Sequence, residues 1–174
     1  MTVDLPTFEF NGFTLRVATA DDLPLAQAWT DADPDHRGMD AHFWIEQKPG
    51  TNSMMLEDAI GPIFFFKMER VVPPGAAGIE MPLRSESTVQ INLGRALELH
   101  IQFAPGDHGL KLRTMQGLSK GMGWLEKNLA EQGYDALFFT SKNPRLITFC
   151  ECRLEFTAIS WANGETRLKR YITR

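Results

Sequence analysis

The stretch ALELHIQF, from Ala96 to Phe103, alternates between apolar and polar residues. This alternation predicts a β-strand, because successive side chains of a strand point to opposite faces of a sheet. Its polar side chains, which all face the same way, are Glu98, His100 and Gln102. A central strand with helices over both faces is usually apolar on both. The polar face of this strand therefore needs an explanation, either functional or structural.

Regular patterns continue on the carboxyl-terminal side of this strand. Residues 114–132 carry apolar side chains at steps of three and four, which predicts a helix. The apolar run from Tyr134 to Ser141 predicts a strand buried on both faces. Asn143 and Pro144 suit the cap and first turn of a further helix. An Asn-Gly pair at 163–164 predicts the turn of a closing hairpin.

On the amino-terminal side, Phe13–Thr19 predicts a strand, and a helix begins near Ala20. Asp35–Gln47 predicts a second helix that ends at a Lys-Pro-Gly sequence and has Met39, Phe43 and Trp44 on its inner side. A hairpin is expected next, with strands at residues 54–57 and 63–71.

Residues 73–94 are rich in Pro, Gly and Ser and follow no sustained period. We expect a long loop there, of the kind that often has a function, with a short strand possible at Ser87–Ile91. The whole order of elements predicts one α/β (α+β) domain over residues 1–174, with a mixed central sheet flanked by helices.

Composition narrows the class of protein. The 174 residues contain 43% hydrophobic and 23% charged residues, as in an ordinary globular protein. The net charge of −4 argues against a general nucleic-acid binder, which would be basic. The sequence contains no apolar run of membrane-spanning length and no signal peptide, so we expect a cytoplasmic protein without a membrane partner.

The only cysteines are Cys150 and Cys152. Bridging two cysteines this close on a helix would strain a disulfide, so free thiols in a reducing compartment are expected. The four histidines do not cluster at metal-ligand spacing, and we expect no metal.

The order of elements, from LRVATADDLP near the start to the closing hairpin, resembles the GNAT acetyltransferase superfamily. The most specific part is NPRLITFCECRLEF at 143–156. Family members often carry Asn-x-x-(small or apolar)-Ile-x-x-Tyr-Glu-x-x-Gly-Phe here. This sequence matches it at Asn143, Leu146, Ile147 and Glu151, has Cys150 in the place of the Tyr, and reaches Phe156 after one extra residue.

The resemblance implies a GNAT-like fold whose two central parallel strands, Ala96–Phe103 and Tyr134–Ser141, splay apart at their carboxyl ends. Acetyl-coenzyme A would enter the gap, with its pantetheine arm along the backbone at Phe103 and Ala104. Its pyrophosphate would lie on the N–H groups that open the next helix, at Thr114, because a helix amino terminus attracts anions. The implied reaction is acetyl transfer to an amine of a small molecule or a peptide.

Two residues of the 143–156 stretch have both a functional and a structural interpretation. By resemblance, Asn143 contacts the pantetheine arm, whereas its position also suits a helix cap. Cys150 stands where many members have the Tyr proposed to protonate the leaving thiolate, whereas a buried free Cys is more often a small core residue.

The pyrophosphate loop departs from the family's (Arg or Gln)-x-x-Gly-x-(Gly or Ala). The sequence here is HGLKLRTMQGL. A motif started at His108 has one glycine at its beginning, Gly109, and a turn several residues too long. With Arg113 at the Arg position, Gln116 and Leu118 replace the two small residues. Lys111 and Arg113 can supply positive charge instead, although a solvated basic turn would look the same. Three glycines lie within the following helix, and we expect them to serve close packing.

On the polar strand face, Glu98 is the first candidate for the base that takes the proton of the amine, and His100 the second. The alternative is that both residues pair with a neighbouring cation or face water. Replacing Glu98 with Gln is expected to abolish activity without unfolding the chain.

Three functions remain open. The first is an acetyl-CoA-dependent N-acyltransferase, and the second is a non-catalytic GNAT-fold binding or assembly module that has lost the phosphate loop. The third, a thiol enzyme that uses Cys150, lacks an evident His partner. Apolar residues near the closing hairpin, such as Trp161, would permit a homodimer.

Overall fold

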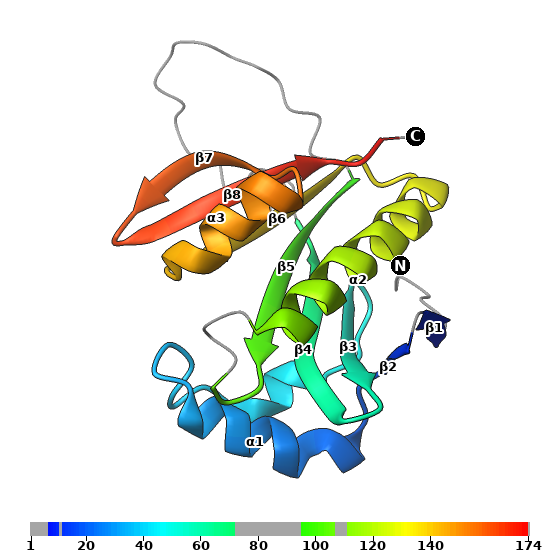
Figure 1. Ribbon diagram of the computed structural model, residues 1–174, viewed down its shortest axis with the longest axis vertical. Helices are drawn as coiled ribbons and strands as arrows, with labels where there is room; N and C mark the ends of the chain where they lie inside the picture. The colour runs from blue at the N-terminus through cyan, green and yellow to red at the C-terminus, as the bar shows by residue number, and fades with distance from the viewer. Residues whose placement is uncertain (1–6, 11, 72–94, 107–110, 174) are drawn as a thin grey trace.

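The structure is a computed structural model that describes residues 7–10, 12–71, 95–106 and 111–173. The described residues form one mixed sheet of eight strands, in the order β1-β2-β3-β4-β5-β6-β8-β7 (Figure 1). Only β5 and β6 run parallel among these strands. The strands are β1 Phe8–Phe10, β2 Phe13–Val17, β3 Thr51–Asp58, β4 Gly61–Arg70, β5 Ala96–Phe103, β6 Ala136–Ser141, β7 Thr157–Ala162 and β8 Glu165–Tyr171.

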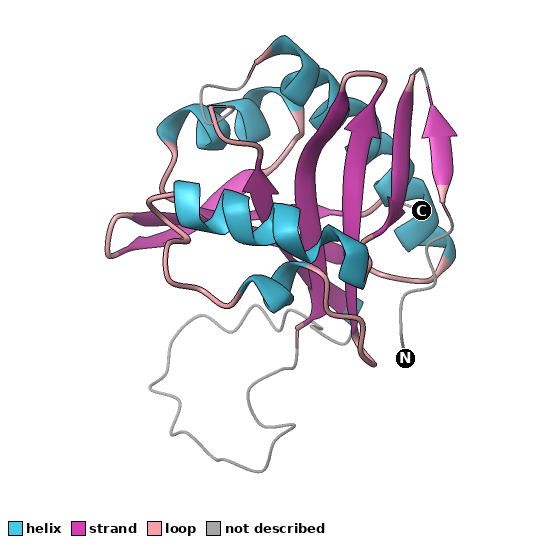
Figure 2. Ribbon diagram, turned by 90° about the horizontal axis from the view of Figure 1, so that it is seen from below, coloured by secondary structure: helices cyan, strands magenta, loops and turns pink. Residues whose placement is uncertain are grey.

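Helices cover both faces of this sheet (Figure 2). One face packs against α2 (Leu112–Glu131) and α3 (Pro144–Arg153), and the main core lies between this face and the two helices. The other face packs against α1 (Leu23–Ala32) and the short 3-10 helix η2 (Ala41–Trp44). A further 3-10 turn, η1 (Ala20–Asp22), opens α1. The predicted mixed α/β fold is confirmed, and so are the strand at Ala96–Phe103 and the closing hairpin.

The predicted helix at Asp35–Gln47 is wrong, because only Ala41–Trp44 is helical and as a 3-10 turn. Gly38 has a φ of +88°, which a helix cannot contain, and Asp40 caps the short turn that follows it. Trp44 is nevertheless buried, as the sequence pattern indicated, while Met39 is exposed.

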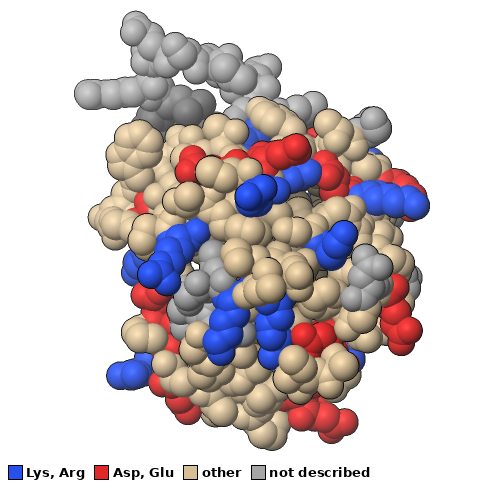
Figure 3. Space-filling view, viewed as in Figure 1, with Lys and Arg blue, Asp and Glu red and all other residues tan. Residues whose placement is uncertain are grey.

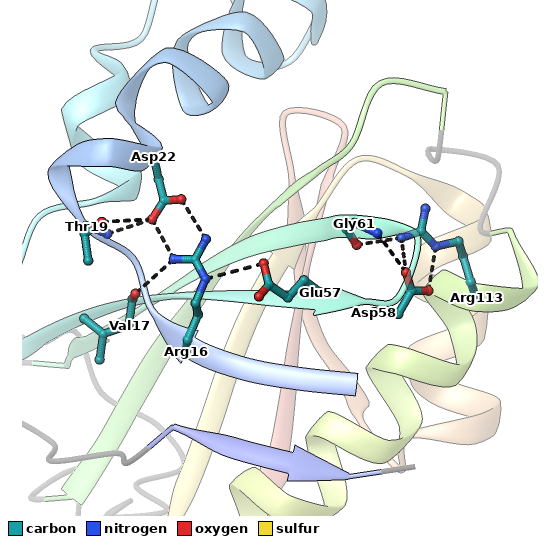
Figure 4. A network of polar contacts seen from close by, with 8 residues as sticks. All are labelled: Arg16, Val17, Thr19, Asp22, Glu57, Asp58, Gly61 and Arg113. Carbon is teal, nitrogen blue, oxygen red and sulfur yellow. Dashed lines mark hydrogen bonds and ion pairs between the residues drawn. The ribbon is translucent and has the colours of Figure 1, made fainter. Parts of the chain in front are cut away.

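An arginine on β2 ties the sheet to the 3-10 turn that opens α1 (Figure 4). Arg16 on β2 donates hydrogen bonds of 2.8 Å to both carboxylate oxygens of Asp22 in η1 and lies 3.4 Å from Glu57 on β3. This bidentate contact is the main cause that holds the pKa of Asp22 below its ordinary value. The beginning of α1 is thereby attached to the sheet.

The parallel strands separate along their length. Residues 96–99 of β5 pair with residues 136–139 of β6, and the pairing stops there. Beyond that point β5 still pairs with β4 as far as Phe103, and β6 still pairs with β8 as far as Ser141. Each strand is thus held by its outer neighbour while the two carboxyl ends diverge, as the GNAT resemblance implied.

The register also shows which backbone groups face this gap. Val71 donates to the carbonyl of Ala96, and Ala104 donates to the carbonyl of Ile63. Hydrogen-bonded pairs alternate along an antiparallel ladder, so the even-numbered residues of β5 bond to β4. The N–H and C=O groups of Ile101 and Phe103 therefore point to the side on which β6 has moved away. The carbonyl of Phe103 accepts a hydrogen bond from the side chain of Gln102 at 3.1 Å.

Glycines in α2 give a matched test of packing. A Cβ on Gly117 would lie 2.6 Å from Cδ2 of the buried Leu56, whereas a Cβ on Gly123 would meet nothing within 4 Å. We expect Gly123→Ala to raise the free energy of unfolding by about 0.8–1.0 kcal/mol through helix propensity. Gly117→Ala is expected to fall about 1–3 kcal/mol below that variant because of overpacking. Chemical denaturation measures both, and equal stabilisation would show that the contact at Gly117 is unimportant.

None of the helices in the described part of the chain is long and apolar enough to cross a membrane. The predicted 73–94 loop, with its possible strand at Ser87–Ile91, lies outside the described residues.

Candidate active site

A cavity of about 200 Å³ lies where β5 and β6 diverge. It is lined by the ends of both strands, by the start of α3 and by the segment that follows α1. The charged and titratable side chains of the lining belong to Asp33, Asp35, His36, His100, Lys142 and Glu165. The fold thus gathers polar groups from four distant parts of the sequence at the open end of the parallel pair.

His100 extends from the polar face of β5 into this cavity. Its ring contacts Phe43 edge-on, with the ring centroids 5.3 Å apart, and its Nε2 lies 3.4 Å from Oε2 of Glu69. Burial is the main cause that lowers the pKa of His100 from its ordinary value of 6.5, and it outweighs the nearby carboxylates. A neutral imidazole in a half-buried position is suited to accept a proton at neutral pH.

Glu98 does not line this cavity. One carboxylate oxygen lies 2.5 Å from the guanidinium of Arg167 on β8, and the other accepts a hydrogen bond from Thr140 at 3.3 Å. The alternative interpretation, in which Glu98 pairs with a cation, therefore agrees with the structure, and the cation is Arg167. The geometry therefore reverses the predicted order, and His100 becomes the first candidate for the base.

A buried amide network forms one wall of the cavity, and sequence reasoning missed it. Gln102 is completely buried and donates to Asp33 at 2.9 Å, while its oxygen lies 2.6 Å from Nδ1 of His36. Asp33 is also almost fully buried. The signal in the sequence was the polar Gln102 on a central strand, but its partners lie more than sixty residues earlier in the chain.

Asn143 caps α3. Its side-chain oxygen accepts hydrogen bonds from the backbone N–H groups of Arg145, at 3.0 Å, and Leu146, at 3.3 Å. The capping interpretation is therefore confirmed. Asn143 also lines the cavity, so a contact with a bound ligand remains a prediction.

The two roles of Asn143 can be separated by substitution. Asn143→Ala is expected to lower the free energy of unfolding by about 1 kcal/mol, whereas Asn143→Ser keeps a side-chain acceptor and most of the stability. If the amide also contacts the pantetheine arm, both variants bind acetyl-CoA more weakly. Chemical denaturation and calorimetric titration measure the two effects, and unchanged affinity in both variants would leave Asn143 as a cap alone.

Cys150 lies in the main core, 3% exposed, and Cys152 is exposed, and both are free thiols as predicted. Burial raises the pKa of Cys150 to about 12. Such a thiol is a poor proton donor to a thiolate of ordinary acidity, and Cys150 does not line the cavity described above. The core interpretation therefore holds, and the structure supports neither the acid role nor a thiol enzyme.

The residues predicted to bind the cofactor do not all lie at the cavity. Phe103 lines the cavity, but the N–H of Ala104 is bonded to Ile63. Thr114 is fully buried in α2. Gly109 lies outside the described residues.

Arg113 has a structural role that the sequence did not indicate. It donates to both oxygens of Asp58, at 3.0 and 2.8 Å, and to the carbonyl of Gly61 at 2.8 Å (Figure 4). Its guanidinium is thereby committed to the turn between β3 and β4. Lys111, in contrast, is exposed at the beginning of α2.

Basic side chains gather around the middle of the face that α2 and α3 cover (Figure 3). Between these two helices runs an open groove whose cations are Arg145 and Arg153 and whose apolar residues include Met115 and Phe149. The described residues contain no group of three or more His, Cys, Asp or Glu side chains placed to hold a metal ion.

Comparison with solved structures finds GNAT proteins along nearly the whole chain. The GNAT domain of S. lividans PAT matches with a TM-score of 0.60 and 14% identity, over 91% of this chain and 90% of that chain. The aminoglycoside N(6')acetyltransferase of Legionella pneumophila matches with a TM-score of 0.58 and 14% identity, over 95% and 94%. YncA of Salmonella typhimurium, solved with its cofactor acetyl-CoA, gives 0.58 and 14%, over 94% and 95%.

No model of a protein family and no curated protein sequence matches the chain. At identities this low, the likeness to solved structures establishes the fold, while function has to be argued from the site. The chain has the GNAT fold, as its sequence predicted.

Proposed function

We propose that this protein transfers an acetyl group from acetyl-CoA to an amine that enters the cavity between β5 and β6. The observation that carries the proposal is the divergence of these strands around a cavity that holds a half-buried His100. The similarity to the GNAT structures supports the fold only, because the sequence identities are low. The proposed reaction is therefore argued from the residues of this cavity.

The residues of the cavity fit a thioester co-substrate. The backbone groups of Ile101 point into the gap, where an amide-containing arm can pair with them as an added strand would. Acetyl-CoA supplies an activated acetyl carbonyl when it is bound. The groove with Arg145 and Arg153 offers positive charge for its phosphates.

The protein's part in the reaction is to deprotonate and orient the amine. The amine nitrogen bonds to the acetyl carbon, the carbon–sulfur bond breaks, and the coenzyme leaves as a thiolate. His100 accepts the proton that the nitrogen loses, because its ring is neutral and borders the cavity. The carboxylate of Asp35 at the cavity favours an acceptor that arrives as an ammonium ion, whereas Glu165 is paired with Lys142 at 3.4 Å. Such an acceptor loses one proton to water before it attacks, and His100 takes the second.

Calorimetric titration with acetyl-CoA tests the first step, with desulfo-coenzyme A as the control. Saturable binding at one site is expected, and acetyl transfer to a panel of primary amines would then be measured. No binding heat and no thermal stabilisation at millimolar acetyl-CoA would overturn the enzyme proposal. That result would favour the alternative, a GNAT-fold binding or assembly module, whose partner a pull-down experiment would seek.

A further inference from the structure

A chain of charged groups lies behind His100, on the side away from the cavity. Nε2 of His100 lies 3.4 Å from Oε2 of Glu69, and the other oxygen of Glu69 lies 3.4 Å from Nζ of Lys67. Lys67 also donates to Glu46 at 3.0 Å. Lys67 and Glu69 both come from β4, where Lys67 pairs directly with His100 across the strands.

Lys67 is held in one position. Its side chain is 1% exposed, and its ammonium lies 3.7 Å from the centroid of the Phe43 ring. The same ring packs edge-on against His100. A buried ammonium needs compensating partners, and Glu46, Glu69 and the face of Phe43 supply them. Because Lys67 is fixed in this way, it also restricts the carboxylate of Glu69.

We propose that Glu69, held by the buried Lys67, positions the imidazole of His100 and determines which ring nitrogen carries the proton. The proposal rests on the proposed function of His100 as the base. With Nε2–H directed at Glu69, Nδ1 is the nitrogen that accepts the proton of the amine, and the positive ring that results is stabilised by the carboxylate. Glu69 is thus a positioning residue that does not contact the substrate.

The distance of 3.4 Å between Nε2 and Glu69 is longer than a well-formed hydrogen bond, and Nε2 is buried without a hydrogen-bond partner among the described residues. The contact is expected to shorten when the ring becomes charged, since catalytic hydrogen bonds are often long before substrate binds. A buried ring nitrogen without another partner is what such a contact requires.

The charges around His100 act in opposite directions. Glu69 on β4 and Glu98 on β5 favour its protonated form, whereas Lys67 on β4 disfavours it. From η2, His100 is faced by the uncharged ring of Phe43. Glu69→Gln should therefore lower the pKa of His100, and Lys67→Met should raise it.

The test follows the ring of His100 by NMR of the intact protein labelled with ¹⁵N, with its signals assigned by their loss in His100→Gln. We expect the Nε2–H tautomer in the parent protein. We expect a lower pKa and a changed tautomer ratio in Glu69→Gln, and a raised pKa in Lys67→Met. The matched control is Glu131→Gln, an exposed carboxylate at the end of α2, which should change neither quantity.

Acetyl transfer is the second readout. Glu69→Gln is expected to lower kcat roughly 10–100-fold, by analogy with the hydrogen-bond partners of metal-bound histidines, and to shift the acidic limb of the pH profile. If the protein is active but Glu69→Gln changes neither the tautomer nor the profile, the positioning role is overturned. If the NMR shifts appear as expected but no amine is acetylated, the positioning stands and the proposed function fails. Should Lys67→Met not fold, Glu69→Gln alone decides.

Discussion

Replacing His100 with Gln is expected to lower kcat/KM for acetyl transfer by roughly 10²–10⁴, the usual contribution of a general base. The expectation follows from the position of His100, because it is a titratable group on β5 that borders the cavity and is neutral at pH 7. Steady-state kinetics with a saturating amine would measure the loss. The matched comparison is Glu98→Gln, whose carboxylate is engaged by Arg167 and which should cost less.

The pH dependence of activity and of stability, compared between the parent protein and His100→Gln, gives a second check on the role of His100. The pKa of His100 lies below 6.5 in the folded state, so the proposed acetyl transfer by the parent protein should decline as the pH falls through that lowered value. In the window between 6.5 and the folded pKa, the unfolded chain binds a proton that the native ring does not, so stability falls as the pH falls. His100→Gln should lose both dependences. A variant that keeps the acidic limb, or that remains as active as the parent, would exclude His100 as the base.

Replacing Phe65 with Ala is expected to lower the free energy of unfolding by about 3–5 kcal/mol, as large-to-small substitutions of core aromatics do. Phe65 on β4 is 0% exposed, and its ring packs edge-on against Trp29 of α1 at a centroid distance of 5.3 Å. The two rings hold α1 against the sheet. The segment that follows α1 carries Asp33, Asp35 and His36 to the cavity, so the loss should also weaken acceptor binding.

Trp161→Ala is the control for Phe65→Ala. It removes a larger side chain, but Trp161 is 80% exposed on β7, and the expected change is within about 0.5 kcal/mol. Urea denaturation of both variants gives the comparison. A Phe65→Ala loss as small as that of Trp161→Ala would show that α1 is not held through this contact. A large loss for Trp161→Ala would indicate that β7 is covered by another molecule, as in the homodimer that the exposed apolar residues would permit.

Local sequence patterns predicted most of the fold. Each of these patterns depends on residues that are close together in the sequence. The side chains of the strand Ala96–Phe103 alternate with a period of two, and those of α2 repeat with a period of 3.6. The Asn-Gly pair forms a turn by itself. The helix predicted at Asp35–Gln47 failed because Gly38 takes a left-handed conformation that an apolar pattern does not reveal. Its inner residue Trp44 was nevertheless recognised, since burial follows hydrophobicity more closely than helicity does.

The site could be predicted only in part. The amino-acid sequence by itself determined that β5 has one polar face. For Asn143 and Cys150 it offered the helix cap and the core position as one of two interpretations, and the structure shows both. Only the tertiary structure favours His100 over Glu98 as the proposed base, because Glu98 is engaged by Arg167, 69 residues away along the chain. Only the tertiary structure shows that Arg113 pairs with Asp58 and that Glu69 and Lys67 lie next to His100. Ion pairs between side chains on different strands depend on register and burial, which no local pattern of residues encodes.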